Sequence, residues 1–275
     1  MQLQDKLALN KKEGKALLAT NFYNFETLAA VLTAAKNHHS ELILQLSESS
    51  LKYMGLDVAV SLAKAGIEQF GVKAWLHMDH GSDVNLVKAC LDAGFDSVMI
   101  DASEKPFDEN VKITKEIVKY AEQFNANVEA ELGYIAKLGQ GQNMVYTQPE
   151  EAKTFVEETG INALAVAVGS AHGFYKETPK LQLDLIAEIN AATPAALVLH
   201  GSSGIPHDQI QESIRRGITK INLATEIKNI FMKKLQEVLA GSDEIDLRKV
   251  FPKATQAATD LVSEKLEVIN LQVIA

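Results

Sequence analysis

The sequence predicts an α/β protein that folds as a (β/α)8 TIM barrel, and two observations support this prediction. Short apolar runs recur at intervals of roughly thirty residues along the 275-residue chain, and most of them precede a stretch with the apolar spacing of an amphipathic helix. Strands that are buried on both faces read as continuous apolar runs, as in a parallel sheet wrapped by helices. Since no linker-like stretch divides the chain, we expect residues 1–275 to form a single domain.

The eight expected strands are each four or five residues long, and the clearest helical patterns lie between them. The expected strands are 16–20, 42–46, 74–78, 97–100, 127–130, 164–168, 196–199 and 220–223. The clearest helical patterns are 25–37, 107–124, 149–158 and 227–239. An open doubly wound sheet is the alternative, but its dinucleotide-binding form needs a glycine-rich fingerprint after the first strand, and none is present.

The composition narrows the classes of function. The chain carries 27 basic and 36 acidic residues, a net charge of −9, which argues against a nucleic-acid partner because phosphate backbones require a basic surface. No run of eighteen apolar residues suggests a membrane span, and the N-terminal residues lack the apolar core of a signal peptide. A single cysteine excludes an internal disulfide framework. We therefore expect a cytoplasmic protein that does not engage membranes.

Polar side chains follow nearly every expected strand, at the end where (β/α)8 enzymes place their catalytic groups. These residues are Asn21, Ser47, Asp79, His80, Asp101, Glu131, His172, His200 and Asn222. Polar residues are common where a strand enters a loop, so a single Asn or Ser carries little weight. Three histidines at such ends carry more, because three neutral imidazoles with an open fourth position form a catalytic zinc site. Such a metal polarises a substrate carbonyl.

Acidic residues accompany the proposed ligands His80, His172 and His200. Asp79 precedes His80 directly and is placed for proton transfer beside a metal, although a helix cap or an ion pair is the alternative. Asp101 and Glu131 could orient the ligand imidazoles, form a second metal position, or be solvated loop acids.

Two loops are suited to an anion. Residues 201–204 (Gly-Ser-Ser-Gly) follow the seventh strand, and residues 222–225 close the eighth strand and open a helix. Barrels frequently bind phosphate there with backbone N–H groups and a helix N-terminus. Lys176 and Lys228 are candidate cations for the same anion.

Other chemistry-bearing residues have structural interpretations. We expect His77 to be a hydrogen-bonded core residue inside the third strand and Cys90 to be a core residue of the following helix. His38 and His39 end a helical stretch, and His207 lies near a helix start.

Six motifs, in this order, resemble the class II, zinc-dependent ketose-bisphosphate aldolases over essentially the whole chain. They are 76–81 (LHMDHG), 97–103 (SVMIDAS), 128–133 (VEAELG), 165–173 (AVAVGSAHG), 197–201 (LVLHG) and 220–226 (KINLATE). The resemblance implies an aldehyde-lyase of carbohydrate metabolism, as in glycolysis, that interconverts a phosphorylated ketose and triose phosphates. It also implies a homodimer or homotetramer.

The resemblance implies a role for each matching residue. His80, His172 and His200 would hold Zn2+, Asp79 would exchange the proton of the C4 oxygen, and Asn222 would contact the three-carbon product. Further substrate-binding positions are Asn21, Ser47, Gly173, Gly201, Ser203, Ala224, Thr225, Lys228 and Arg248, with Arg248 reaching a second phosphate across a subunit interface. The family's monovalent-cation site (Na+ or K+) would lie near Gly169, Gly201 and Ser203.

Two positions bear on substrate and mechanism. Many fructose-type enzymes of the family carry Asp where this chain has Ala224, whereas tagatose-type enzymes resemble it, so the chain leans toward tagatose 1,6-bisphosphate. After residue 133 the family has a mobile loop with a proton-transferring glutamate, but residues 134–146 contain no carboxylate and have Lys137, Gln140 and Gln142 instead.

The leading hypothesis is thus a zinc-dependent aldolase, and three alternatives remain. A degenerate homologue would bind metal and sugar phosphate with little turnover, or act on a different phosphorylated ketose. A Schiff-base aldolase needs a lysine facing the substrate, and the ends of strands six and seven offer none. A zinc hydrolase on the same barrel often has a His-x-His pair on an early strand, and strand one has none.

Overall fold

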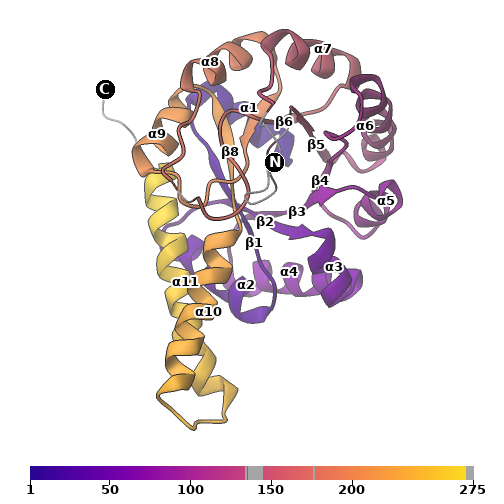
Figure 1. The fold of residues 1–275 in the computed structure, drawn as a ribbon. Coiled ribbons are helices and arrows are strands. Elements are labelled where there is room, and N and C mark those ends of the chain that lie inside the picture. Colours follow the sequence, from indigo (N-terminus) through magenta and orange to yellow (C-terminus); the bar gives the residue numbers. More distant parts are fainter. Residues whose placement is uncertain (134, 136–144, 176, 271–275) are drawn as a thin grey trace.

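A computed structural model of the chain describes residues 1–133, 135, 145–175 and 177–270 and shows a closed barrel (Figure 1). Eight parallel strands pair in chain order, and β8 closes the ring by pairing with β1. Their bounds are β1 Leu17–Asn21, β2 Leu42–Ser47, β3 Ala74–Gly81, β4 Ser97–Ile100, β5 Asn127–Leu132, β6 Ala163–Val166, β7 Ala196–Leu199 and β8 Ile218–Leu223. The predicted (β/α)8 barrel is confirmed.

Helices surround the sheet, and the four clearest predicted helices are all present (Figure 1). Residues 25–37 match α2 at both ends, and the predicted stretch 107–124 divides into α6 and a short 3-10 helix. The helices are α1 Leu3–Glu13, α2 Phe25–Asn37, α3 Glu48–Met54, α4 Leu56–Phe70, α5 Val84–Asp92, α6 Phe107–Ala121, η1 Glu122–Phe124, α7 Pro149–Thr159, α8 Leu183–Ala192, α9 His207–Arg215, α10 Thr225–Ala240 and α11 Leu247–Asn270.

The inside of the barrel changes from apolar to polar along the strands. Near the N-terminal ends, inward side chains such as Ile43 and Trp75 form one apolar cluster with Leu3 and Leu7 of α1. Above this cluster lie buried polar side chains, among them Glu129 of β5, and the C-terminal ends carry the polar residues predicted from the sequence. Because side chains alternate between the faces of a strand, each strand contributes to successive interior layers.

A second apolar core lies between the sheet and the helices, and it fixes the helices on the barrel. Phe155 of α7 is fully buried there and meets Phe107 of α6 edge-on, with ring centroids 5.9 Å apart. Cys90 of α5 is fully buried in the same core, which confirms its predicted structural role.

The last two helices form a hairpin that extends well beyond the barrel (Figure 1). α11 packs on α2, while the end of the hairpin, where α10 passes into α11, projects away from the barrel. Ile245 and Leu247 at its tip are 91% and 60% exposed. Within the described residues, no helix has the length and apolar character required to cross a membrane.

Phe155→Ala tests the packing of the helical layer. Removing a fully buried phenylalanine leaves a cavity, and we expect the free energy of unfolding to fall by about 3–5 kcal/mol. Tyr53→Ala, at an aromatic residue that is 82% exposed, is the matched control and should change it by less than about 0.5 kcal/mol. Urea denaturation measures both; equal midpoints for the two variants would contradict the assigned packing.

Candidate active site

A cavity of about 190 Å³ opens at the C-terminal end of the barrel. It lies among the loops that follow the strands, where all but one of the substrate-binding positions predicted from the sequence come together. Its lining residues are Asn21, Tyr23, Ser47, Ser49, Asp79, His80, His172, Gly173, Gly201, Ser203, Asn222, Ala224, Thr225 and Lys228. A larger cavity of about 950 Å³ lies beside α1 and contains no group of side chains with metal-ligand geometry among the described residues.

Three imidazoles converge at this cavity. The ring centroid of His80 lies 4.8 Å from that of His172 and 4.7 Å from that of His200. One nitrogen from each ring falls within 4.8 Å of the other two, an arrangement that could hold a metal ion. Nε2 of His80 and Nδ1 of His200 are 3.0 Å apart. Neighbouring ligand atoms of a tetrahedral zinc site are about 3.3 Å apart, so these two nitrogens are already spaced as a ligand pair.

A local distortion of β3 brings both Asp79 and His80 to the cavity. Consecutive strand residues normally point to opposite faces. Here the pairing of β3 with β4 shifts register between Met78 and Gly81, and His80 adopts a left-handed φ of 51°. Left-handed backbone is unfavourable for a residue with a side chain and is concentrated at functional sites. The distortion turns two adjacent side chains toward one point.

Asp101 and Glu131 lie beside the imidazoles and contact different rings. Asp101 accepts a hydrogen bond from Nδ1 of His80 at 2.8 Å, which leaves Nε2 of that ring facing the other histidines. Glu131 lies 3.8 Å from Nδ1 of His200, and burial together with the charge of Asp101 raises the pKa of Glu131 to about 8. His80, Asp101 and Glu131 also form a second group that could hold a metal.

The two closest imidazoles differ in protonation. Burial lowers the pKa of His80, but Asp79, Asp101 and Glu131 outweigh burial and raise the pKa to about 9. For His200, burial and the neighbouring charge of His80 both lower the pKa well below its usual value. Without a metal, His80 is therefore a cation that donates to the neutral His200.

Asp79 is a buried carboxylate held by two amides. Its oxygens accept hydrogen bonds from Nδ2 of Asn21 at 3.1 Å and from Nδ2 of Asn222 at 3.3 Å. Burial raises the pKa of Asp79, but the charges of His80 and Lys220 and the hydrogen bond from Asn21 outweigh it and lower the pKa overall. Both asparagines keep a buried Oδ1 that has no hydrogen-bond partner among the described residues. Such atoms are costly unless a ligand satisfies them.

Two backbone segments beside the imidazoles line the cavity, one at Gly201 and one at the start of α10. Gly201 has φ 65°, and a Cβ there would lie 2.3 Å from the carbonyl oxygen of Ala171, so only glycine fits. α10 begins at Thr225, directly after β8, and its N-terminus faces the same cavity. Lys228, one turn into α10, places its Nζ 5.4 Å from the ring centroid of Tyr23. The residues predicted to bind an anion thus line one part of the cavity, and the anion site itself stays a prediction.

Other predicted residues lie elsewhere. Arg248 is at the start of α11 on the projecting hairpin, where it pairs with Asp246 at 3.0 Å, and it does not line the cavity of its own chain. Gly169 also does not line it. Lys176, Lys137, Gln140 and Gln142 lie outside the described residues.

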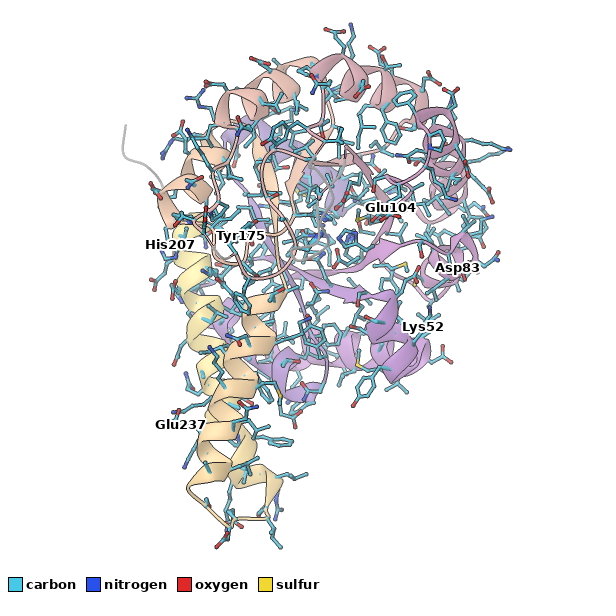
Figure 2. All side chains as sticks on the ribbon, in the orientation of Figure 1. Lys52, Asp83, Glu104, Tyr175, His207 and Glu237 are labelled. Carbon is cyan, nitrogen blue, oxygen red and sulfur yellow. The ribbon has the colours of Figure 1, made fainter. Side chains whose placement is uncertain are left out.

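Sequence reasoning missed several residues that support the site. Glu129 and Lys220 form a buried ion pair below His200, and each is two positions before a predicted site residue on the same strand. That spacing of two was the available signal. Tyr175, labelled in Figure 2, belongs to the connection that follows β6 in the chain; its hydroxyl accepts from the amide of Ala171 and donates to the carbonyl of Gly201. It thereby joins the segments that carry His172 and His200.

His77 is buried and hydrogen-bonded to Ser97, which confirms its predicted core role.

Comparison with known proteins agrees with this geometry. The family described as "Fructose-bisphosphate aldolase class-II" matches residues 1–272. A fructose-bisphosphate aldolase of Geobacillus stearothermophilus is 42% identical over 255 residues, covering 90% of this chain and 88% of the relative. One of Helicobacter pylori is 35% identical over 290 residues, covering 94% of each chain. The crystal structure of the YdjI aldolase from Escherichia coli K12 superposes with a TM-score of 0.88 at 29% identity, covering 98% of this chain and 96% of that one. The chain belongs to the class-II fructose-bisphosphate aldolase family.

Proposed function

We propose that this chain catalyses the zinc-dependent, reversible cleavage of a ketose 1,6-bisphosphate to dihydroxyacetone phosphate and glyceraldehyde 3-phosphate. One observation carries the proposal above all: Asp79, His80 and His172 line one cavity at the rim of the barrel, and the buried ring of His200 completes the group of three imidazoles. Family membership supports the same reaction class.

The residues fit zinc. Their donor set is three imidazole nitrogens, the set that binds catalytic zinc with an open fourth position. Asp101 fixes the ring of His80 from behind, as outer partners of zinc-bound histidines do. His80, His172 and His200 would hold the ion, and a bound zinc would polarise the C2 carbonyl of the ketose. The Na+ or K+ site near Gly169, Gly201 and Ser203 remains a prediction.

Asp79 would act on the C4 hydroxyl. Its pKa is lowered, so the carboxylate is ready to accept the proton. Asn21 and Asn222 hold both oxygens in place, so the side chain does not have to reorganise. When the C3–C4 bond breaks, C4 becomes the aldehyde of glyceraldehyde 3-phosphate. The electron pair stays with the three-carbon fragment. C3 of that fragment would take a proton from water, and the proton that Asp79 accepted from the C4 hydroxyl would return to water. Asn222 would hold that fragment through its unpartnered Oδ1.

The phosphate of the three-carbon fragment would bind between residues 201–204 and the N-terminus of α10. Gly173, Gly201, Ser203, Ala224 and Thr225 line this part of the cavity, and Lys228 adds a cation. Helix N-termini favour anions because unpaired N–H groups point outward there. Asn21 and Ser47 would contact the sugar hydroxyls from β1 and β2.

Asp79→Asn tests the proposed base. The amide keeps the shape but cannot accept the proton, so we expect kcat to fall by about 10²–10⁴-fold while zinc content stays unchanged. Asp83→Asn is the matched control. This exposed residue lies between β3 and α5 and caps α5 (Figure 2). Triose phosphate release, coupled to a dehydrogenase, and metal analysis give the two readouts. Full activity in Asp79→Asn would remove Asp79 from the mechanism.

The epimer preference depends on Ala224. We expect the wild-type protein with zinc to cleave tagatose 1,6-bisphosphate with a higher kcat/KM than fructose 1,6-bisphosphate, and a chelator to abolish both activities. Ala224→Asp adds a carboxylate at the cavity, and a single hydrogen bond can discriminate epimers. The ratio of the two kcat/KM values should then move toward fructose. A wild-type preference for fructose would refute the tagatose assignment, and activity that survives the chelator would refute the zinc dependence.

We further propose that the chain forms a homo-oligomer through the α10–α11 hairpin, with Arg248 contributing to the active site of a second copy. The hairpin projects into solvent with apolar side chains at its tip, and exposed apolar patches mark interaction sites (Figure 1). Arg248 stands on the same hairpin and is remote from the cavity of its own chain.

The double variant Ile245→Glu/Leu247→Glu tests this interface. Charges at the tip should convert the oligomer into a monomer, measured by light scattering after gel filtration, and should raise KM for the bisphosphate. Val58→Glu, at an apolar residue of α4 that is 61% exposed, should leave the mass unchanged. A wild-type protein that is already monomeric would contradict the proposal.

A further inference from the structure

A charged pair lies inside the barrel, one layer below the imidazoles. Lys220 of β8 and Glu129 of β5 are fully buried, and Nζ donates to Oε2 of the carboxylate at 2.7 Å. The Nζ of Lys220 also lies 3.4 Å from Nε2 of His77. A buried ion pair of this kind adds little to stability, because desolvation of the two charges offsets their attraction. Its position therefore calls for another reason.

The second oxygen of the carboxylate supplies that reason. Oε1 of Glu129 lies 2.9 Å from Nε2 of His200. A carboxylate can only accept, so Nε2 of His200 must carry the proton and donate it. In a neutral imidazole the other nitrogen then has a free lone pair. That nitrogen, Nδ1, faces His80 and belongs to the metal-ligand group.

We propose that Glu129 and Lys220 are positioning residues that select the tautomer of His200 and so make Nδ1 its metal-binding atom. This inference rests on the proposed function, because it concerns the proposed zinc site. Glu129 holds the proton of His200 on the side away from the metal. Lys220 occupies the other oxygen and prevents the carboxylate from turning.

The hydrogen bonds of the Glu129–Lys220 ion pair continue across the barrel. Since the ammonium of Lys220 donates to Nε2 of His77, the proton of His77 is on Nδ1, which donates to Oγ of Ser97 at 2.7 Å. Ser97 also accepts from Nδ2 of Asn127 at 2.8 Å. Strands β3, β4, β5 and β8 thus hold the pair from several sides, which fixes the direction of the carboxylate.

A pair of variants separates this role from simple packing. Glu129→Gln leaves one acceptor oxygen for two donors. The charged Lys220 takes that oxygen, the amide NH2 turns to Nε2 of His200, and the proton of His200 moves to Nδ1, where it opposes metal binding. In Glu129→Gln/Lys220→Met the ammonium is gone, so the amide oxygen can again accept from His200.

Zinc affinity, measured by competition with a chromophoric chelator, is the readout. We expect Glu129→Gln to raise the zinc Kd by about 10–100-fold. The double variant should bind zinc more tightly than Glu129→Gln alone, although it lacks two native side chains. Thr159→Val, which loses a buried hydrogen bond to the carbonyl of Phe155 within α7, outside this network, should keep the wild-type Kd. Circular dichroism and unfolding midpoints verify that each variant is folded.

The outcomes distinguish this inference from the proposed function. If the wild-type protein binds no zinc, both fail. If the wild-type protein binds zinc and Glu129→Gln binds equally well, or the double variant is no better than the single one, the positioning role is refuted. Imidazole 15N NMR of the metal-free wild-type protein decides the same point without variants, with His200→Ala assigning the signal. A proton on Nε2 of His200 supports the inference, and a proton on Nδ1 overturns it.

Discussion

Closure of the parallel barrel is the constraint on which the rest of the structure depends. Once β8 pairs with β1, every second side chain of each strand points into one enclosed space, and all strands end at the same rim. Residues far apart in sequence, such as His80 and His200, become neighbours for this reason alone. The same closure excludes water from the layer beneath them. Any charge placed there needs a partner from another strand.

The functional rim departs from regular barrel geometry at one place. β3 could present either Asp79 or His80 to the interior, but not both, if it kept the regular alternation. The register shift and the left-handed backbone at His80 remove this restriction. The buried carboxylate proposed as the base and an imidazole proposed as a zinc ligand then share one short segment. The surrounding hydrogen bonds, from Asn21 to Asp79 and from His80 to Asp101, hold the distorted segment in place.

The sequence predicts those parts of the fold and of the site that leave a recognisable pattern of polar and apolar residues. The sequence shows where the strands end, because polar residues interrupt the apolar runs there. The three histidines and Asp79 were identified from these positions. Glu129 was read as part of a strand, although its spacing of two from Glu131 placed it on the interior face. The role of Lys220 was not predicted, because a lysine is almost never buried without a partner. Its partner, Glu129, lies on another strand and cannot be identified from the sequence around Lys220. Arg248 was found by family resemblance, but the fold places it far from the cavity, which sequence spacing cannot show.

The distribution of charge explains how an acidic chain can handle an anionic substrate. A net charge of −9 repels anions at long range, yet long-range fields are screened within about 8 Å at physiological salt. What counts is the charge inside the cavity and below it. There, Lys220 offsets Glu129 and contributes to the lowered pKa of Asp79, while α10 directs its N-terminus at the same space. The buried lysine thus pairs with the carboxylate that contacts the imidazole of His200, and its charge favours the ionised form of Asp79, the proposed base.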